Sequence, residues 1–243
     1  MLNKIDLTGK RALITGAGGG IGRAIALRLA EDGMKLALVG RNPEKLTRTA
    51  ALTGRPLDML VLPADLETPR AFDDIERIIT GHFGGLDVLV NNAGAALNKP
   101  FEETTDEEYD HLMNINARVP FILCRRMLPL LRQSGCPTII NIGSVVSHKG
   151  YVRQAAYSAS KHALLGMTKA LAREVAPEGI RVHLLAPGGV FTDMVRIARP
   201  DLSPEGMIQP EEVAELAAFL VEHRGNAVID EIQVHRVGKE PFM

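Results

Sequence analysis

The stretch RALITGAGGGIGRAIALRLAE, residues 11–31, decides the fold of this chain. It opens with a β-type apolar run at residues 11–15, passes directly into a glycine-rich turn, and continues at residues 21–31 with apolar side chains at helical spacing. Glycine suits such a turn because it permits a tight reversal, close approach of a phosphate to the backbone, and close packing of the helix on the strand. This order predicts the first strand–turn–helix unit of a nucleotide-binding sheet.

The turn also predicts where a dinucleotide binds. The helix N-terminus presents free N–H groups and the positive end of the helix dipole to a pyrophosphate. The alternative is a flexible turn that is merely rich in glycine, but its place directly after the first strand favours the nucleotide. The predicted contacts of the dinucleotide in this turn are Gly16, Gly18, Gly19, Gly20, Ile21 and Gly22.

The rest of the chain repeats the alternation of strand and helix. Further strands are expected at residues 36–39, 57–62, 87–90, 138–142, 180–185 and 228–234, and helices at 43–51, 69–83, about 106–131, 157–176 and 210–223. Thr105 and Glu108 form a capping box before the long helix. Strict alternation with right-handed crossovers predicts an α/β protein: a single-domain Rossmann fold over residues 1–243, with a doubly wound seven-stranded parallel sheet and helices on both faces.

One connection, at about residues 189–209, is long and holds few periodic apolar positions, which is typical of a functional lid over a substrate site. Within it, Met194, Met207 and Ile208 either line an apolar substrate cleft or anchor the lid, and the sequence leaves both readings open.

Composition excludes several classes of function. The 243 residues carry 28 basic and 29 acidic side chains, so a dedicated nucleic-acid or anionic-membrane binder, which needs a basic excess, is not expected. No apolar run is long enough to span a membrane, and the N-terminus lacks a signal core, so we expect a cytoplasmic protein. Cys124 and Cys136 are expected to be free thiols, and no Cys or His spacing predicts a metal site.

The end of the second strand predicts which dinucleotide is used. NAD enzymes place an acidic residue there for the ribose 2′-hydroxyl, whereas a nearby arginine favours the 2′-phosphate of NADP. This chain has Gly40-Arg41-Asn42, with no carboxylate to repel a phosphate and one guanidinium to bind it. We therefore predict NADP (NADPH) as cofactor; the alternative is an arginine that only caps the strand end.

Six motifs in order make the chain resemble the short-chain dehydrogenase/reductase family over nearly its whole length. They are the TGxxxGxG turn at residues 15–22, the Asn-Asn-Ala-Gly at residues 91–94, Asn116 on the long helix, Ser144 after the fifth strand, Tyr157-x-x-x-Lys161, and Pro187-Gly188 followed by Thr192. The resemblance implies an oxidoreductase that transfers hydride, from the pro-S face of the nicotinamide, to a carbonyl.

The resemblance also implies a role for each of four catalytic residues. Tyr157 would be the general acid/base, Lys161 would lower its pKa and bind the nicotinamide ribose, Ser144 would bind the substrate carbonyl, and Asn116 would hold a water that connects Lys161 to solvent. Tyr157 and Lys161 share a helix face. A cation about 4 Å away supplies roughly the 4 kcal/mol needed to lower a tyrosine pKa from about 10 to neutrality. The alternative reading of the pair is an exposed Tyr and Lys on an amphipathic helix.

Other cofactor contacts carry over by position in the resemblance. Asp65 and Leu66 would flank the adenine, and Val190 and Thr192 would meet the carboxamide of the nicotinamide beside Pro187 and Gly188. The motif residues Asn92, Ala93 and Gly94 would pass under the ribose. Ser147 and His148 follow the catalytic serine and would either touch substrate or be ordinary structural and surface residues.

Within the family, the 3-oxoacyl-[acyl-carrier-protein] reductases look most similar, but the chain departs from them. Those enzymes often carry a basic residue where this chain has Glu178, and a carboxylate would repel an acidic carrier protein. Many NADP-preferring members carry a basic residue where this chain has Gly19, so Arg41 would act alone. The family's C-terminal Gly-Gly is absent.

Three functions follow as hypotheses. The first is an NADP-dependent carbonyl reductase acting on a small molecule or an acyl thioester. The second is a sugar, polyol or other secondary-alcohol dehydrogenase of the same family, and the third is a non-catalytic nucleotide-sensing protein, although such proteins commonly lack the Tyr or the Lys. Surplus apolar residues on the helices at 106–131 and 157–176, such as Phe121, predict burial against a partner. The family resemblance implies that this partner is a second copy, which pairs these two helices in a homodimer or homotetramer.

Overall fold

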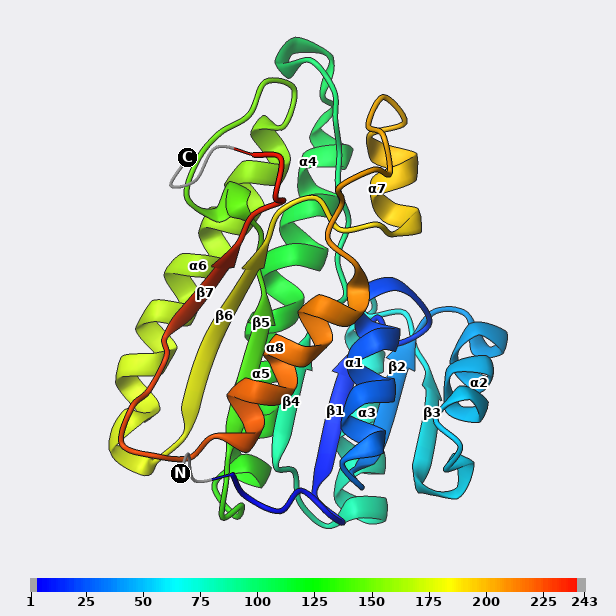
Figure 1. Cartoon of the computed structure of the whole chain (residues 1–243), viewed down its shortest axis with the longest axis vertical. Coiled ribbons are helices and arrows are strands. Elements are labelled where there is room, and N and C mark those ends of the chain that lie inside the picture. Colours follow the sequence, from blue (N-terminus) through cyan, green and yellow to red (C-terminus); the bar gives the residue numbers. More distant parts are fainter. Residues whose placement is uncertain (1–3, 240–243) are drawn as a thin grey trace.

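A computed structural model describes residues 4–239 and contains one seven-stranded sheet (Figure 1). All neighbouring strands run parallel, in the order β3-β2-β1-β4-β5-β6-β7. The order reverses between β1 and β4, which is the switch point where doubly wound sheets bind ligands. The predicted fold class is confirmed, with strands β1 (Arg11–Thr15), β2 (Lys35–Gly40), β3 (Met59–Pro63), β4 (Val88–Asn91), β5 (Thr138–Ile142), β6 (Arg181–Pro187) and β7 (Glu231–Val234).

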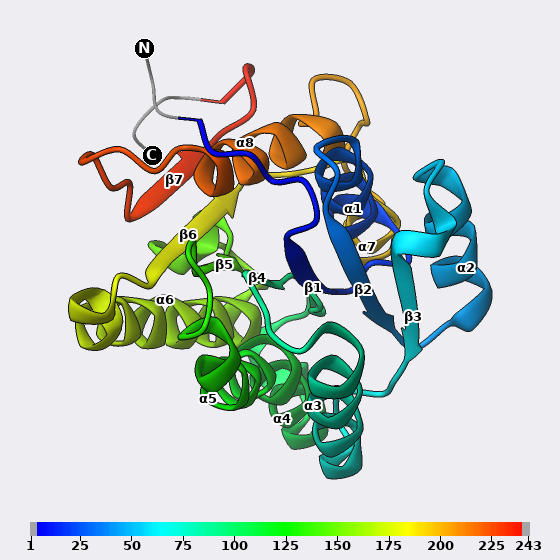
Figure 2. The same cartoon turned by 90° about the horizontal axis from the view of Figure 1, so that it is seen from below.

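Helices cover both faces of the sheet (Figure 2). One face carries α1 (Gly20–Glu31), α2 (Pro43–Leu52) and α8 (Pro210–Glu222), and the other carries α3 (Pro69–Phe83), α4 (Asp106–Met113), α5 (Val119–Leu131) and α6 (Ala155–Val175). Successive β1 side chains serve the two cores alternately: Ile14 packs with α1, and Leu13 packs with α3 and α5. The central strands are therefore buried on both sides, as parallel sheets require.

Local chemistry explains where the helices begin and end. Proline at the first position opens α3, and Gly84 closes it in the left-handed region at φ 66°. The predicted capping box of α4 is confirmed, because Glu108 N donates to Thr105 Oγ1 at 3.3 Å and Thr105 N donates to Glu108 Oε2 at 2.9 Å. Cys124 and Cys136 are both free and buried, as expected.

The long helix expected at residues 106–131 is wrong as one regular helix, because a π-helical turn at Asn114–Arg118 interrupts it. Val119 N donates to Asn114 O, five residues back. Pro120 has no N–H to donate to the Asn116 carbonyl four residues earlier, so the regular hydrogen-bond ladder is interrupted at this point. The irregularity places a buried Asn116 at the site described below.

Several further bounds differ from the sequence prediction, and the last strand begins at Glu231 instead of residue 228. The lid contains a short helix, α7 (Asp193–Ala198), whose N-terminus is capped by Thr192 Oγ1 accepting from Val195 N at 3.3 Å. The third strand begins only after a 3-10 turn at Pro56–Asp58, which leaves Leu57 fully exposed. No helix among residues 4–239 combines the length and apolarity needed to cross a bilayer.

Candidate active site

A cavity of about 270 Å³ lies where the carboxyl ends of β1, β4, β5 and β6 meet, beside the switch point of the sheet. The chain of loops that follows these strands forms its walls. Predicted site residues that line it are Gly16, Gly18, Gly19, Gly20, Ile21, Asn92, Ala93, Gly94, Asn116, Ser144, Tyr157, Lys161, Pro187, Gly188, Val190 and Thr192.

The glycine turn is so close to the end of β4 that two of its positions exclude any side chain. A Cβ on Gly22 would lie 2.4 Å from both Asn92 Nδ2 and Gly16 O, and a Cβ on Gly16, which has φ 67°, would lie 2.7 Å from Asn92 Nδ2. These glycines let the first helix pack directly against the strand end. The glycine turn therefore forms the floor of the cavity.

The Asn-Asn-Ala-Gly motif ties the glycine turn to β4. Thr15 Oγ1 accepts from the backbone N–H of Asn92 and of Ala93, each at 2.9 Å, and Asn92 Nδ2 donates to Thr15 O at 2.9 Å. Because Thr15 ends β1 and Asn92 follows β4, these bonds hold the two central strand ends in fixed register. The backbone that lines the cavity is consequently rigid before any ligand binds.

Ser144 and Tyr157 meet in the cavity from two different elements. Ser144 follows β5 and caps a 3-10 turn at Val145–Ser147, where its Oγ accepts from Val146 N at 3.4 Å. Tyr157 lies in the first turns of α6. Burial raises the pKa of Tyr157 above its usual 10.0, and the neighbouring Ser144 hydroxyl counteracts part of that rise. The two side chains therefore belong to the wall of the same cavity.

Lys161 is a buried cation, and its Nζ donates to the Ile142 carbonyl at 2.8 Å. Burial lowers the pKa of Lys161 to about 8. Its Nζ lies 6.0 Å from the centre of the Tyr157 ring. Burial is therefore the largest influence on the pKa of Tyr157 in the folded chain, and the ammonium group of Lys161 is directed at a backbone carbonyl; a lowering of the tyrosine pKa by Lys161 stays a prediction.

Asn116 positions the loop after β4 from within the π-helical turn. Its Oδ1 accepts from Ala95 N at 3.0 Å, and its Nδ2 donates to Ala95 O at 2.9 Å and to Ser160 Oγ at 3.0 Å. These bonds engage both polar atoms of the side chain. The water expected at this residue would therefore have to bind its backbone carbonyl, which Pro120 cannot reach with a hydrogen bond.

Four predicted cofactor contacts lie outside the cavity wall. Gly22 is packed beneath the turn, and Leu66 is buried in the core on the α3 side. Arg41 and Asp65 are exposed after β2 and β3, at the same edge of the sheet as the cavity. Their roles toward an adenosine group stay predictions.

The lid residues divide between the two readings that the sequence left open. Met194 lines the cavity, whereas Met207 and Ile208 are buried and anchor the lid. Phe191 N donates to Ile208 O at 2.8 Å, and Ile208 N donates to Gly189 O at 3.1 Å, which closes the base of the lid. Thr192 lies directly over the glycine turn, since a Cβ on Gly20 would be 3.0 Å from its Cγ2.

The residues that follow Ser144 have structural contacts. Ser147 Oγ is buried and accepts from Ser144 N at 3.2 Å. His148 Nε2 pairs with Glu231 of β7 and does not line the cavity. These contacts favour the structural reading of both residues.

Sequence reasoning missed six residues of the cavity wall. Lys45 comes from α2, Ala95 follows β4, Asp193 and Val195 come from α7, and Ile142 and Gly143 come from the end of β5. The only sequence signal was their place directly after strands or in the lid. Whether such residues face the cavity depends on the docking of α2 and α7.

The shape and the polar groups of the cavity suit a dinucleotide. Its floor is a cradle of glycines that added Cβ atoms would fill, at the N-terminus of a twelve-residue helix. The buried ammonium of Lys161 bonds only a neutral carbonyl, so it suits an acceptor such as a ribose hydroxyl. Within residues 4–239, no group of three or more His, Cys, Asp or Glu side chains is arranged to hold a metal ion.

Comparison with known proteins agrees with this geometry. The sequence model described as short chain dehydrogenase matches residues 10–203. An uncharacterized oxidoreductase of Bacillus subtilis strain 168 is 35% identical over 209 residues, which cover 86% of this chain and 81% of the relative.

Solved structures extend the likeness to the whole fold. A metagenomic short-chain oxidoreductase in complex with NADP is 31% identical with a TM-score of 0.84, over 96% of this chain and 100% of that one. The 3-ketoacyl-(acyl-carrier-protein) reductase of Brucella melitensis, complexed with NADH, is 31% identical with a TM-score of 0.84, over 94% and 97% of the two chains.

Proposed function

This chain is an oxidoreductase of the short-chain dehydrogenase family, and from that premise we propose that it reduces a carbonyl to a secondary alcohol with NADPH. The observation that carries the proposal is the convergence of Ser144, Tyr157 and Lys161 on one cavity floored by the glycine turn. NADP is supported by Arg41 at the end of β2 and by the NADP complex of the metagenomic relative. The Brucella relative was crystallised with NADH, so the likeness alone favours neither dinucleotide.

When bound, the nicotinamide supplies the hydride, and the chain supplies the groups around it. The glycine turn would bind the pyrophosphate through backbone N–H groups at the start of α1. Asn92, Ala93 and Gly94, which line the cavity, would lie under the ribose, and Lys161 would donate to its hydroxyl groups. Val190 and Thr192 would bind the carboxamide from the base of the lid.

Tyr157 supplies the proton as general acid, because its hydroxyl and the Ser144 hydroxyl share the cavity. Ser144 donates its hydrogen to the developing oxyanion, a contact that strengthens as charge accumulates. The buried ammonium of Lys161 favours the tyrosinate left behind, and this effect requires Nζ to turn from the Ile142 carbonyl toward the ribose and the tyrosine oxygen.

For the substrate, we propose an apolar carbonyl compound, with a 3-oxoacyl thioester as the first candidate. Met194, Val190 and Val195 give the cavity an apolar side next to the catalytic groups. Glu178 argues less strongly against an acidic carrier than its charge suggests, because Arg132 Nη2 donates to its Oε1 at 3.0 Å and the guanidinium offsets the negative charge. We therefore keep an acyl carrier protein as a candidate partner of the surface around Glu178.

The test follows the oxidation of NADPH and of NADH with an acetoacetyl thioester and a panel of ketones and diketones. We expect turnover with NADPH, and loss of about 10²–10⁴-fold in Tyr157→Phe, because that variant keeps the ring and removes only the proton donor. Tyr151→Phe, at an exposed tyrosine outside the cavity wall, is the matched control. Undiminished turnover by Tyr157→Phe would refute the mechanism.

The same panel separates the substrates. Turnover confined to the thioester supports a 3-oxoacyl reductase, and turnover of the ketones alone supports a general carbonyl reductase. A preference for NAD and for sugar or polyol oxidation would replace the proposal by the alcohol dehydrogenase alternative.

We also propose that the enzyme is a homodimer or homotetramer that pairs α5 and α6. These helices lie side by side on the outer surface of one sheet face (Figure 2), and Phe121 of α5 is 53% exposed there. An aromatic ring left this open favours burial against a second copy. Sedimentation at micromolar concentration tests the idea: Phe121→Asp is expected to dissociate the assembly, and a monomeric wild type would contradict it.

A further inference from the structure

The adenosine end of the cavity contains a lysine that no motif of the sequence singled out. Lys45 of α2 lines the cavity together with Gly18 and Gly19. A Cβ on Gly18 would lie 3.1 Å from Lys45 Cβ, whereas a Cβ on Gly19 would have no atom within 4 Å. The base of the Lys45 side chain therefore packs on the glycine turn, and the space over Gly19 is open to its ammonium group.

The backbone of Lys45 is held firmly against that turn. Lys45 N donates to Asn42 Oδ1 at 2.9 Å at the start of α2, and Leu46 is fully buried beside Gly40. One turn later, Thr49 Oγ1 donates to Ala17 O at 2.9 Å. Because these contacts fix α2 at three successive points, the Cα of Lys45 is held at the rim of the cavity next to the glycine turn.

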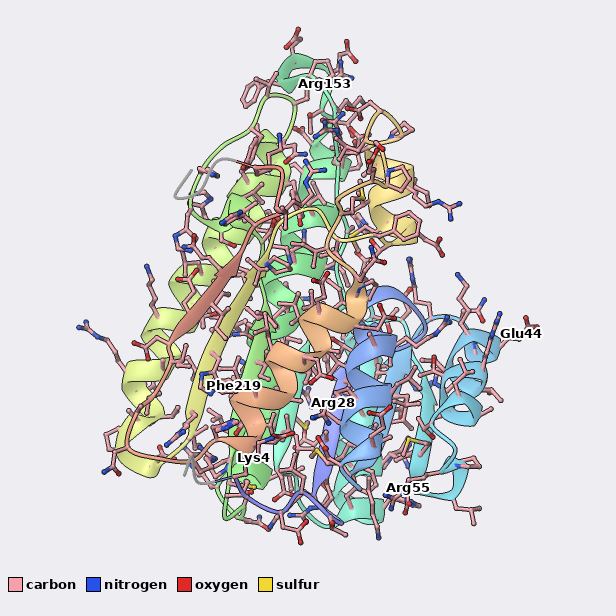
Figure 3. All side chains as sticks on the ribbon, viewed as in Figure 1. Lys4, Arg28, Glu44, Arg55, Arg153 and Phe219 are labelled. Carbon is pink, nitrogen blue, oxygen red and sulfur yellow. The ribbon has the colours of Figure 1, made fainter. Side chains whose placement is uncertain are left out.

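Two basic side chains at this rim, Arg41 and Lys45, form no ion pair with the carboxylates nearby, Asp65 after β3 and Asp193 in the cavity wall, among the residues that the structure describes. Arg41 is exposed at the end of β2, four residues before Lys45. The ion pairs found in the part of the chain from residue 4 to 239 include neither side chain. The neighbouring carboxylate, Glu44, points away from the turn at the outer edge of α2 (Figure 3).

We propose that Lys45 is a second determinant of cofactor specificity and binds the ribose 2′-phosphate of NADP jointly with Arg41. The inference rests on the proposed use of NADPH. A phosphate group accepts charge-assisted hydrogen bonds from both a guanidinium and an ammonium, the latter acting as a mobile point charge. Many NADP-preferring members of the family carry a basic residue at the position where this chain has Gly19. Lys45 supplies that positive charge from α2 instead. The 2′-hydroxyl of NAD offers it no comparable charge.

The experiment compares Lys45→Gln, Arg41→Gln and Lys45→Arg with the wild type by calorimetric titration of NADP⁺ and NAD⁺. Adenosine 2′,5′-bisphosphate and 5′-AMP, which differ only by the 2′-phosphate, are titrated in parallel and report on the subsite without any turnover. Arg48→Gln is the matched control, because it removes one exposed charge from the same helix outside the cavity wall. Thermal unfolding of each variant verifies that it folds.

We expect Lys45→Gln to weaken NADP⁺ and the bisphosphate by about tenfold and to leave NAD⁺ and 5′-AMP within about twofold. The loss should shrink at high salt, and Lys45→Arg should retain most of the affinity. A Lys45→Gln variant that weakens all four ligands equally, or none, overturns the proposal. If the wild type still prefers NADP⁺ and only Arg41→Gln removes that preference, the proposed cofactor stands and the role of Lys45 falls. If the wild type binds NAD⁺ more tightly, both fall.

Discussion

Lys161 is expected to destabilise the cofactor-free protein, and Lys161→Met should reveal this. Burial lowers the pKa of Lys161 from 10.5 to about 8. A difference of this size corresponds to about 3 kcal/mol at neutral pH, where the lysine is charged in both the folded and the unfolded chain. Methionine has similar length and no charge, so it removes this cost.

The substitution also removes a hydrogen bond of Lys161, and the loss of this bond offsets part of the gain in stability. The Nζ bond to the Ile142 carbonyl at 2.8 Å is lost, at a cost of about 2 kcal/mol, because the donor is charged. The variant should therefore be more stable than the wild type by about 1 kcal/mol at pH 7. For a chain of this size, that difference raises the unfolding midpoint by roughly 2–4 °C.

The dependence on pH distinguishes this explanation from improved packing. Between pH 8 and 10.5, the unfolded wild type binds more protons at this position than the folded form, so wild-type stability rises with pH. The advantage of Lys161→Met should be full below pH 8 and disappear toward pH 10.5. Urea unfolding of the cofactor-free protein, at one protein concentration and several pH values, measures it.

Lys169→Met is the control, because it removes an exposed lysine from the same helix and should change stability by less than about 0.5 kcal/mol. The reasoning is refuted if Lys161→Met is less stable than the wild type at pH 7, or if its advantage does not change with pH. The variant should in either case lack reductase activity, which would show that the chain retains a destabilising buried charge for its chemistry.

Three other predictions concern the framework of the site. Gly22→Ala should destabilise the protein by about 1–3 kcal/mol in urea unfolding and weaken NADP⁺ in titrations, because its Cβ would lie 2.4 Å from Gly16 O, whereas Gly19→Ala should leave stability nearly unchanged. Asn116→Ala should reduce stability by about 1–3 kcal/mol and lower kcat, since it leaves both backbone groups of Ala95 unpaired; equal stability of variant and wild type would contradict this. Burial raises the pKa of Asp87, but bonds from Arg11 and Ser134 outweigh it and lower the pKa below 3.8, so stability should fall as the pH drops through that range, and Asp87→Asn should flatten this acid dependence of the urea midpoint.

The sequence by itself determined the fold class and most element boundaries. The predicted bounds 11–15, 69–83 and 138–142 are those of the structure. A short apolar run between turn residues favours a strand, and an amphipathic stretch that begins with proline favours a helix. The order of the motifs likewise placed Ser144, Tyr157 and Lys161 at one edge of the sheet, since parallel strands bring their carboxyl ends together.

Where several elements meet, the sequence was insufficient. The π-helical turn around Asn116 depends on Pro120 together with bonds to Ala95 and Ser160, which lie 21 and 44 residues away from Asn116. The division of the lid methionines is similar, because Met194 and Met207 have the same chemistry and only the path of the lid decides which one faces the cavity.

The electrostatics of the site were decided by tertiary structure alone. Spacing on α6 predicted that Lys161 and Tyr157 share a helix face, but only the folded chain shows that burial raises the pKa of Tyr157 and lowers that of Lys161. Lys45 reaches the cavity only because α2 docks on the glycine turn through Leu46 and Thr49. The local sequence pattern fixes the backbone geometry through short-range steric effects. The protonation of a site residue and its access to the cavity depend on how residues distant in the chain exclude solvent around it.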